Sequence, residues 1–316
     1  MQRDIHDFTI ETLLTFVLCS SCISKDIGQN PSRPFDTRVE SNYSSSFGRK
    51  IDLMDRRLWE PAKDAISDVF WGLDNTWQSQ DLVWRIPDLK AKRPLVTYRR
   101  ENVINHMYYS AKTKDDFGSL RLSFEFKIDG SVGESFRPDW LGNSGVFLMG
   151  MYEIQILDSS RILKTKFLSQ ADPATSSGFV KIPYSGNDMN FRLNELICGS
   201  IYKIKTVSDP LFGVPFSDDG KIMNSCFEPE TWIKVELRFD PPAFVGGKKI
   251  ANARISEYRI NNSSVFFRSE NQLVSHFELP GPTGSLHGRS ETSKGPIVIQ
   301  DHGSPVSFRN FKIETH

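Results

Sequence analysis

Hydrophobic and polar residues alternate along much of the chain. In residues 120–128 leucine, phenylalanine and isoleucine occupy every second position, with charged or polar residues between them. A period of two is typical of an antiparallel strand that packs one face on a core. Residues 233–239 repeat the pattern, and Asn261-Asn262 predicts a turn after a third strand at 253–260. Shorter strands are expected at 146–148, 152–157, 296–300 and 306–313.

Helical periodicity is scarce in this sequence. Only Pro61–Val69 is expected as a short helix, because proline suits the first turn. Many short strands separated by Gly, Pro, Asn and Asp predict an all-β fold, a two-sheet antiparallel β-sandwich. The sequence has no βαβ repeat, phosphate-binding glycine loop or Walker lysine, which argues against nucleotide-dependent chemistry.

The composition indicates a folded protein that does not bind nucleic acid. Among 316 residues, 39 Lys and Arg balance 39 Asp and Glu, whereas a nucleic-acid binder needs a surplus of positive charge. The contents of 38% hydrophobic and 25% charged residues exclude disorder of the whole chain. The expected organisation is a leader at 1–23, a polar tether at 24–65 and one sandwich domain at 66–316.

The N-terminus contains a short apolar run, residues 9–22, that ends in small residues. The run is too short to span a bilayer but suits the core of a signal peptide. Acidic residues precede it where positive charge is preferred, so an ordinary buried helix or a start codon placed too early are the alternatives. We expect export to a periplasmic or extracellular location, with Cys22 as a candidate lipid anchor. No later segment has the length and hydrophobicity of a transmembrane span.

Cysteine use adds little chemistry to this picture. Two of the four cysteines lie in the leader, so a mature chain would keep Cys198 and Cys226. In an exported protein these two could form a disulfide, whereas in the cytosol they would be ordinary thiols. Two cysteines so far apart are not a zinc signature.

A first candidate site lies on the strand expected at 152–157. Alternation places Glu153 and Gln155 on one face, about 7 Å apart, and the apolar Met151 and Leu157 flank them. Partly apolar surroundings raise the pKa of a carboxyl group and make it a better general base. The alternative is a solvent-facing strand with one ordinary glutamate.

A second candidate site lies where the strand at 296–300 ends. The chain continues as Asp301-His302-Gly303, and Pro305 turns it into the next strand. A carboxylate beside His302 could fix the tautomer of the imidazole or raise its pKa. The alternative is a structural turn in which Asp301 caps backbone N–H groups.

Taken in order, these segments resemble the 3-keto-disaccharide hydrolase family. Five motifs carry the resemblance: Gly142–Val146, Tyr152–Ser159, Cys198–Tyr202, Asn224 with Glu230–Trp232, and Gly295–Asn310. The resemblance implies a concanavalin- or laminin-G-like jelly-roll sandwich and a carbohydrate substrate already oxidised to a ketone at carbon 3. The chain departs from the family pattern at 161–197, which is longer than expected and is a candidate lid.

The implied chemistry needs a base, an acid and a group that polarises the ketone. The resemblance makes Glu153 and His302 the catalytic candidates, in either order. The expected substrate-binding residues are Asn143, Tyr152, Gln155, Asp158, Tyr202, Gln300, Asp301 and Arg309. A divalent metal ion held by Glu153, Asp301 or His302 is a candidate electrophile.

Two hypotheses from other functional classes remain open beside the enzyme. One is a non-catalytic, lectin-like carbohydrate-binding sandwich, because this kind of fold does not imply catalysis. The other is a structural sandwich that docks another protein. Convergence of Glu153 and His302 in one pocket would favour the enzyme.

Overall fold

The computed structural model describes most of the chain after residue 46. The described residues are 47–63, 70–71, 78–80, 83–85, 98–100, 103–105, 111–128, 142–163, 167–169, 176–184, 187–204, 207–226, 228, 230–270, 272–283, 289–301 and 306–316. All of them belong to one compact unit, Ser45–His316. The expected leader with Cys22, residues 24–46 of the expected tether, and His302 lie outside the described residues.

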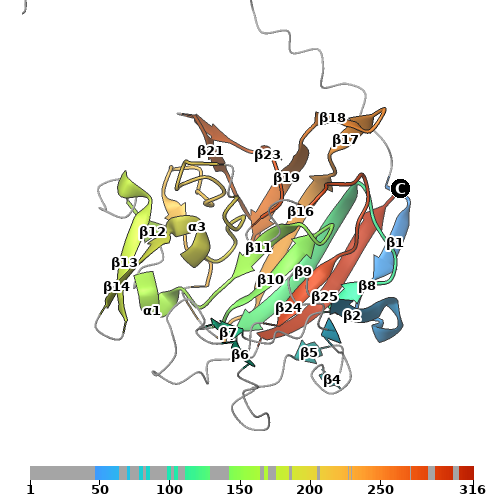
Figure 1. Cartoon of the computed structure of the whole chain (residues 1–316), viewed down its shortest axis with the longest axis horizontal. Coiled ribbons are helices and arrows are strands. Elements are labelled where there is room, and N and C mark those ends of the chain that lie inside the picture. The colour runs from blue at the N-terminus through green and yellow to red at the C-terminus, as the bar shows by residue number, and fades with distance from the viewer. Residues whose placement is uncertain are drawn as a thin grey trace, which may run out of the picture. The chain divides into compact units, whose positions relative to one another are not determined.

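Two antiparallel sheets form the body of the protein (Figure 1). The nine-stranded sheet contains, in spatial order, β20 (Ser263–Ser264), β19 (Ala253–Ile260), β16 (Ile233–Asp240), β9 (Leu120–Ile128), β25 (Val306–Thr315), β5 (Val83–Arg85) and β4 (Gln78–Gln80), with β1 (Arg49–Asp52) on β25 and β23 (Phe277–Leu279) on β19. The six-stranded sheet contains β11 (Tyr152–Ile156), β10 (Ser144–Leu148), β24 (Val298–Asp301), β8 (Ala111–Thr113), β2 (Trp59–Lys63) and β3 (Phe70–Trp71). The predicted all-β sandwich is confirmed.

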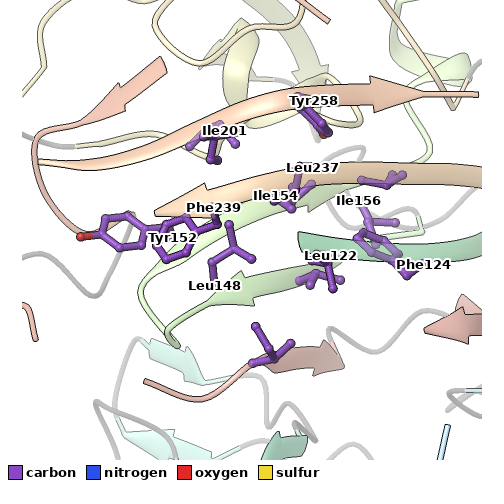
Figure 2. Close-up of a cluster of buried hydrophobic side chains, with 14 of the residues drawn as sticks. Leu122, Phe124, Leu148, Tyr152, Ile154, Ile156, Ile201, Leu237, Phe239 and Tyr258 are labelled. Atoms are coloured by element: carbon purple, nitrogen blue, oxygen red, sulfur yellow. The ribbon is translucent and has the colours of Figure 1, made fainter. Parts of the chain in front are cut away.

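The core lies between the two sheets and follows the predicted alternation. Every second residue of β9, from Leu120 to Ile128, is buried, and the intervening residues face outward. Aromatic contacts join the sheets: the ring of Tyr152 lies 5.6 Å from that of Phe239, between centroids, and both appear in Figure 2. The six-stranded sheet therefore turns one face to the core, and Glu153 and Gln155, also buried, lie on its other face.

The sandwich begins earlier than the sequence predicts. Strand β1 pairs with β25, and β2 pairs with β8, although both lie in the stretch expected as a polar tether. Leu53 is fully buried, and Trp59 donates its indole N–H to the Leu53 carbonyl at 2.7 Å. Residues 61–63, expected in a helix, belong to β2, and residues 64–69 of that helix lie outside the described residues. Tertiary pairing overrides the local pattern here.

The described parts of segment 161–197 fold beside β11 (Figure 1). They pack in two small apolar clusters, which also include Leu157 and residues between 211 and 222. The segment contains α1 (Ser160–Leu163), β12 (Phe167–Leu168), the hairpin β13 (Phe179–Tyr184) and β14 (Asn187–Arg192), and α3 (Leu193–Leu196). Strand β12 pairs with β15 (Ile222–Met223). Leu196 of α3 packs with Ile182 of β13 and with Leu157, which follows β11. This contact places the segment at one end of β11.

Short hairpins and one 3-10 turn complete the described structure. These elements are η2 (Arg56–Leu58), β6 (Tyr98–Arg100) with β7 (Val103–Asn105), β17 (Ala243–Val245) with β18 (Lys248–Ala251), and β21 (Phe267–Ser269) with β22 (Gln272–Val274). Among the described helices, none has the length and hydropathy needed to cross a bilayer.

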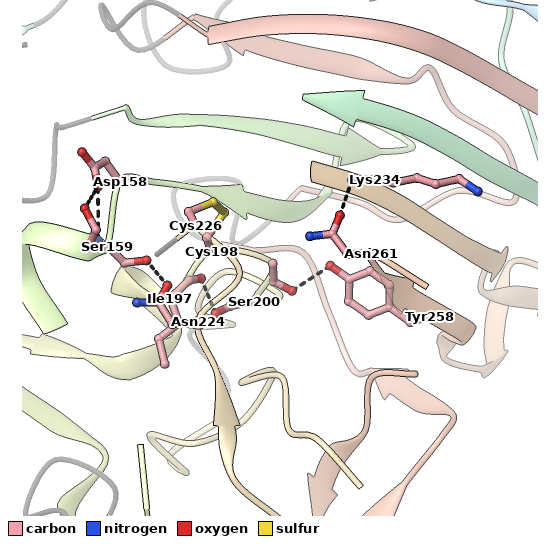
Figure 3. Close-up of a disulfide and its surroundings, with 12 residues drawn as sticks. Asp158, Ser159, Ile197, Cys198, Ser200, Asn224, Cys226, Lys234, Tyr258 and Asn261 are labelled. Atoms are coloured by element: carbon pink, nitrogen blue, oxygen red, sulfur yellow. Dashed lines mark hydrogen bonds between the residues drawn. A yellow bond between two sulfur atoms is a disulfide. The ribbon is translucent and has the colours of Figure 1, made fainter. Parts of the chain in front are cut away.

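A disulfide joins Cys198 to Cys226, with Cα atoms 5.6 Å apart (Figure 3). Both cysteines are buried in the main core. Directly after Cys198, the Gly199 carbonyl accepts a hydrogen bond from the Tyr258 hydroxyl at 2.8 Å. The disulfide thus ties the start of segment 198–203 to the core.

Candidate active site

Two rows of side chains cross the outer face of the six-stranded sheet. In the first row, Gln155 of β11 lies opposite Gly145 of β10, and Gly145 lies opposite Gln300 of β24. In the second row, Glu153 lies opposite Phe147, which lies opposite Val298. Directly opposed residues in antiparallel strands share a face. Since Tyr152, Ile154 and Ile156 belong to the core, both rows face away from it.

The carboxyl group of Glu153 leans over Gly145. A Cβ atom built on Gly145 would lie 2.6 Å from Glu153 Oε1, closer than real Cβ contacts occur. The glycine therefore provides the space that the carboxyl group fills. Only 7% of Glu153 is exposed. One residue without a side chain thus brings Glu153 into the row of Gln155 and Gln300.

Burial dominates the electrostatics of Glu153. No described group donates a hydrogen bond to its carboxyl group, and desolvation raises the pKa of Glu153 to about 8. Burial disfavours the charged form because protein solvates a carboxylate less well than water. A carboxyl group with such a pKa holds its proton at neutral pH and exchanges it with a small change in free energy.

The two glutamines each present an unpaired oxygen. Gln155 Nε2 donates to the Glu195 carbonyl at 3.0 Å, which fixes the orientation of the amide. The Oε1 atoms of Gln155 and of Gln300 are buried, and no described group donates to either. A buried acceptor without a partner is unfavourable by roughly 1–3 kcal/mol. Both oxygens therefore keep unused acceptor capacity on the face that carries Glu153.

The backbone of β11 is held on its outer edge as well. Segment 198–203 continues the sheet: Gln155 N–H donates to the Ser200 carbonyl at 2.8 Å, and Tyr202 N–H donates to the Glu153 carbonyl at 2.9 Å. The Thr283 hydroxyl accepts from Glu153 N–H at 3.1 Å and donates to the Met151 carbonyl at 3.0 Å. These bonds fix the strand that carries Glu153.

Tyr152 and Arg309, expected to bind substrate, lie elsewhere. Tyr152 is fully buried on the core side of β11, where its hydroxyl donates to Glu291. Arg309 lies on the nine-stranded sheet, where its Nε donates to Glu125 at 2.6 Å and its guanidinium lies 4.0 Å from the centroid of the Trp232 ring. Strand alternation puts Tyr152 on the core side, and Arg309 belongs to the other sheet, so neither residue joins the rows that contain Glu153.

The remaining expected residues fall into three positions. Asn143 is 8% exposed and directly precedes β10, in phase with Gly145. Tyr202 lies opposite Glu153, one residue beyond the Ile154–Ile201 bridge. Asp158 is buried and accepts from Ser160 N–H at 3.2 Å at the start of α1.

The structure describes only part of the segment around His302, the second expected catalytic residue. Gln300 is described in full, and the backbone of Asp301 lies opposite Ser144, out of phase with Gln300. The Asp301 side chain and His302 lie outside the described residues, so the convergence of His302 with Glu153 stays a prediction. Within the described part of the chain, no three His, Cys, Asp or Glu side chains form a metal-binding group.

Sequence reasoning did not identify Gly145, Glu195 or Thr283 as parts of the site. A glycine inside a strand indicates that another group approaches the backbone closely, so the sequence did contain an indication that Gly145 belongs to a site. Glu195 and Thr283 carried none, because they reach β11 from segments 40 and 130 residues away.

The chain is similar to a known domain family and to solved structures. A model of the 3-keto-alpha-glucoside-1,2-lyase-like domain matches residues 75–314. A candidate glycosyl hydrolase of Parabacteroides distasonis is 22% identical, covers 84% of each chain and superposes with a TM-score of 0.50. A second candidate glycosyl hydrolase of that organism is 16% identical, covers 85% of this chain and 100% of its own, and has a TM-score of 0.42. No curated protein sequence matches the chain. At 22% identity the first likeness supports the fold.

Proposed function

Because the chain belongs to the 3-keto-alpha-glucoside-1,2-lyase-like domain family, we propose that it cleaves glycosides whose sugar carries a ketone at carbon 3. The family and its fold indicate an enzyme that acts on glycosides. The observation that carries the finer proposal is the position of Glu153. It is a buried carboxyl group with a raised pKa, and it lies over Gly145, whose partners in register are Gln155 and Gln300.

The ketone defines the first chemical step. A carbonyl at carbon 3 acidifies the hydrogen on carbon 2, and the ionised form of Glu153 removes it as a proton. The electron pair of that C–H bond forms an enolate across carbons 2 and 3. A carboxylate that burial has made more basic is suited to this step, because its pKa lies near the working pH.

Cleavage follows from collapse of the enolate. The carbonyl at carbon 3 re-forms, a double bond forms between carbons 1 and 2, and the bond from carbon 1 to the glycosidic oxygen breaks. That oxygen leaves with the electron pair and takes a proton, so the products are an alcohol and an unsaturated keto sugar. Water then adds its hydroxyl to carbon 1 and a proton to carbon 2, which makes the net reaction a hydrolysis.

The chain's own groups supply most of these functions. Protonated Glu153 can return its proton to carbon 2 in the hydration step. The oxygens of Gln155 and Gln300 orient the sugar by accepting from its hydroxyl groups. His302 is the proposed acid for the leaving oxygen, as an expectation from the sequence. A single buried carboxyl group suits this route, whereas ordinary glycosidases need two carboxyl groups roughly 5–9.5 Å apart.

The test compares a 3-keto-glucoside with its unoxidised parent. Purified protein is incubated with each, and the released alcohol is measured. We expect release from the oxidised substrate alone. Equal release from both would indicate ordinary glycosidase chemistry. Binding without release from either would support the lectin-like alternative.

A further inference from the structure

An apolar strip lies beside Glu153 on the outer face of the six-stranded sheet. It consists of Phe147 of β10 and Val298 of β24, which are directly opposed in register. Both are half-buried, unlike the buried apolar residues on the core side of the same strands. Phe147 is also directly opposite Glu153, so the strip begins at the proposed base.

The strip ends at a neutralised charge pair. Lys112 of β8 lies opposite Val298, and Glu60 of β2 lies opposite Lys112. Lys112 Nζ and Glu60 Oε1 are 2.9 Å apart. The side chain of Lys112 is 38% exposed and that of Glu60 is 41% exposed. Each charge is matched by the other, so the Lys112–Glu60 pair itself leaves no unpaired charge at this end of the strip.

The dimensions of the face suit a second ring. Strands β11 and β8 are three steps apart in the sheet, or about 14 Å. The sugar that reacts with Glu153 occupies the first part of that distance. The rest of that distance, from β10 to β8, is about 10 Å and includes Phe147 and Val298, which is comparable with the length of one more ring.

The opposite direction from Glu153 is occupied by the protein itself. Segment 198–203 is hydrogen-bonded along the edge of β11, and the Glu195 carbonyl binds Gln155. The Glu195 carboxylate is in turn held by Lys203 Nζ at 2.5 Å. A leaving group therefore extends toward β10 and β24, away from this edge.

We propose that the apolar strip is the leaving-group subsite and that it selects uncharged leaving groups with an aromatic ring. This inference rests on the proposed function and adds the class of the leaving alcohol. The row of Gln155 and Gln300 complements the hydroxyl groups of the sugar, whereas Phe147 and Val298 complement an apolar surface. Aromatic rings pack on each other in offset or edge-to-face contacts, so Phe147 recognises the ring.

The test uses two substrates that differ in apolar surface and share the same kind of leaving oxygen. These are the methyl and the 2-phenylethyl glycosides of 3-keto-glucose, since both release an unactivated primary or methyl alcohol. We expect kcat/KM to be roughly tenfold higher for the 2-phenylethyl glycoside, mainly through a lower KM. The ratio within one enzyme is the readout, because partial misfolding lowers both values together.

Variants assign the preference to the strip. Phe147→Ala is expected to bring the ratio close to one. Val298→Thr keeps the shape and strand preference of the residue, adds a hydroxyl group to the strip and lowers the ratio. It serves as the second variant if Phe147→Ala does not fold. The matched control is Phe244→Ala, which removes a half-buried phenylalanine from the β17–β18 hairpin and keeps the ratio.

Equal kcat/KM for the two substrates in the unaltered protein would overturn the inference and leave the proposed function standing. So would a preference that both strip variants retain. If neither substrate is cleaved, the proposed function fails, and calorimetric binding of the same two compounds decides the subsite. Tighter binding of the 2-phenylethyl glycoside that Phe147→Ala abolishes supports the strip, and equal Kd values overturn it.

Discussion

The carboxyl group of Glu153 fills the space that a side chain at Gly145 would occupy, with Oε1 2.6 Å from the position of the missing Cβ. The two residues lie on adjacent strands, and their inter-strand pairs are two register positions apart, so that both face the same side of the sheet. The strand pairing therefore aims the carboxyl group at the row of Gln155 and Gln300.

Gly145→Ala tests this relationship. The added methyl group must displace the Glu153 side chain, so we expect turnover of a 3-keto-glucoside to fall about 100-fold, because catalysis is sensitive to small misplacements. Gly118→Ala is the control, since a Cβ there would meet its nearest neighbour at 3.6 Å, an ordinary contact. Turnover in Gly145→Ala equal to that of the control would show that the close approach has no catalytic role.

Glu153→Gln tests the base directly. The change keeps the shape of the side chain and removes its capacity to take a proton, so we expect turnover of a 3-keto-glucoside to fall roughly 100-fold or more. The control is Glu236→Gln, on the outer face of the nine-stranded sheet, where Glu236 pairs with Lys234 at 2.7 Å. Near-normal turnover in a folded Glu153→Gln protein would exclude Glu153 from the mechanism and leave His302 as the leading base.

The raised pKa of Glu153 also predicts how stability depends on pH. Its ordinary value is 4.5 and burial raises it to about 8, so the folded state binds a proton that the unfolded state has lost between these values. Stability therefore falls as the pH rises from 4.5 to 8, by an amount on the order of 4–5 kcal/mol.

Glu153→Gln removes this dependence, because glutamine has no proton to lose. We expect its melting temperature to exceed that of the unaltered protein by several degrees at pH 8, with the difference shrinking toward pH 4. Thermal unfolding of both proteins across this pH range is the measurement. A difference that is constant with pH would mean that Glu153 has the same pKa in the folded and unfolded states.

The disulfide supplies a further prediction. Alkylation of the non-reduced protein followed by mass spectrometry should detect no free thiol at Cys198 or Cys226. Replacing both cysteines by alanine should reduce the free energy of unfolding by about 3–4 kcal/mol, since the bond closes a loop with a sequence separation of 28. Alkylated thiols at both positions in protein purified without reductant would contradict the pairing.

The sequence predicted those parts of the site that depend on alternation within one strand. Glu153 and Gln155 share a face because β11 has a period of two, and the same rule puts Tyr152 in the core. The motif that contains all three residues suggested a common role, and the pleat of the strand separates them.

Other features depend on pairing between distant segments, and no local pattern carries that information. Gln300 lies in the row because β24 pairs with β10 in the register that puts Gln300 opposite Gly145. The apolar residues of β24 alone would allow other registers. Leu53 and Trp59 are isolated apolar residues in a polar stretch, and only their packing in the core makes them part of the sandwich.

The pairing of β1 with β25 has a practical consequence for shortened forms of the protein. A chain trimmed to the matched region, residues 75–314, would lose β1, which pairs with residues 312–315 of β25. It would also lose Leu53 and Trp59 from the core. The freed stretch of β25 would be an open sheet edge, and such edges recruit strands from other molecules. Trimming at the family boundary would therefore favour self-association, whereas a start before Arg49 keeps the edge covered.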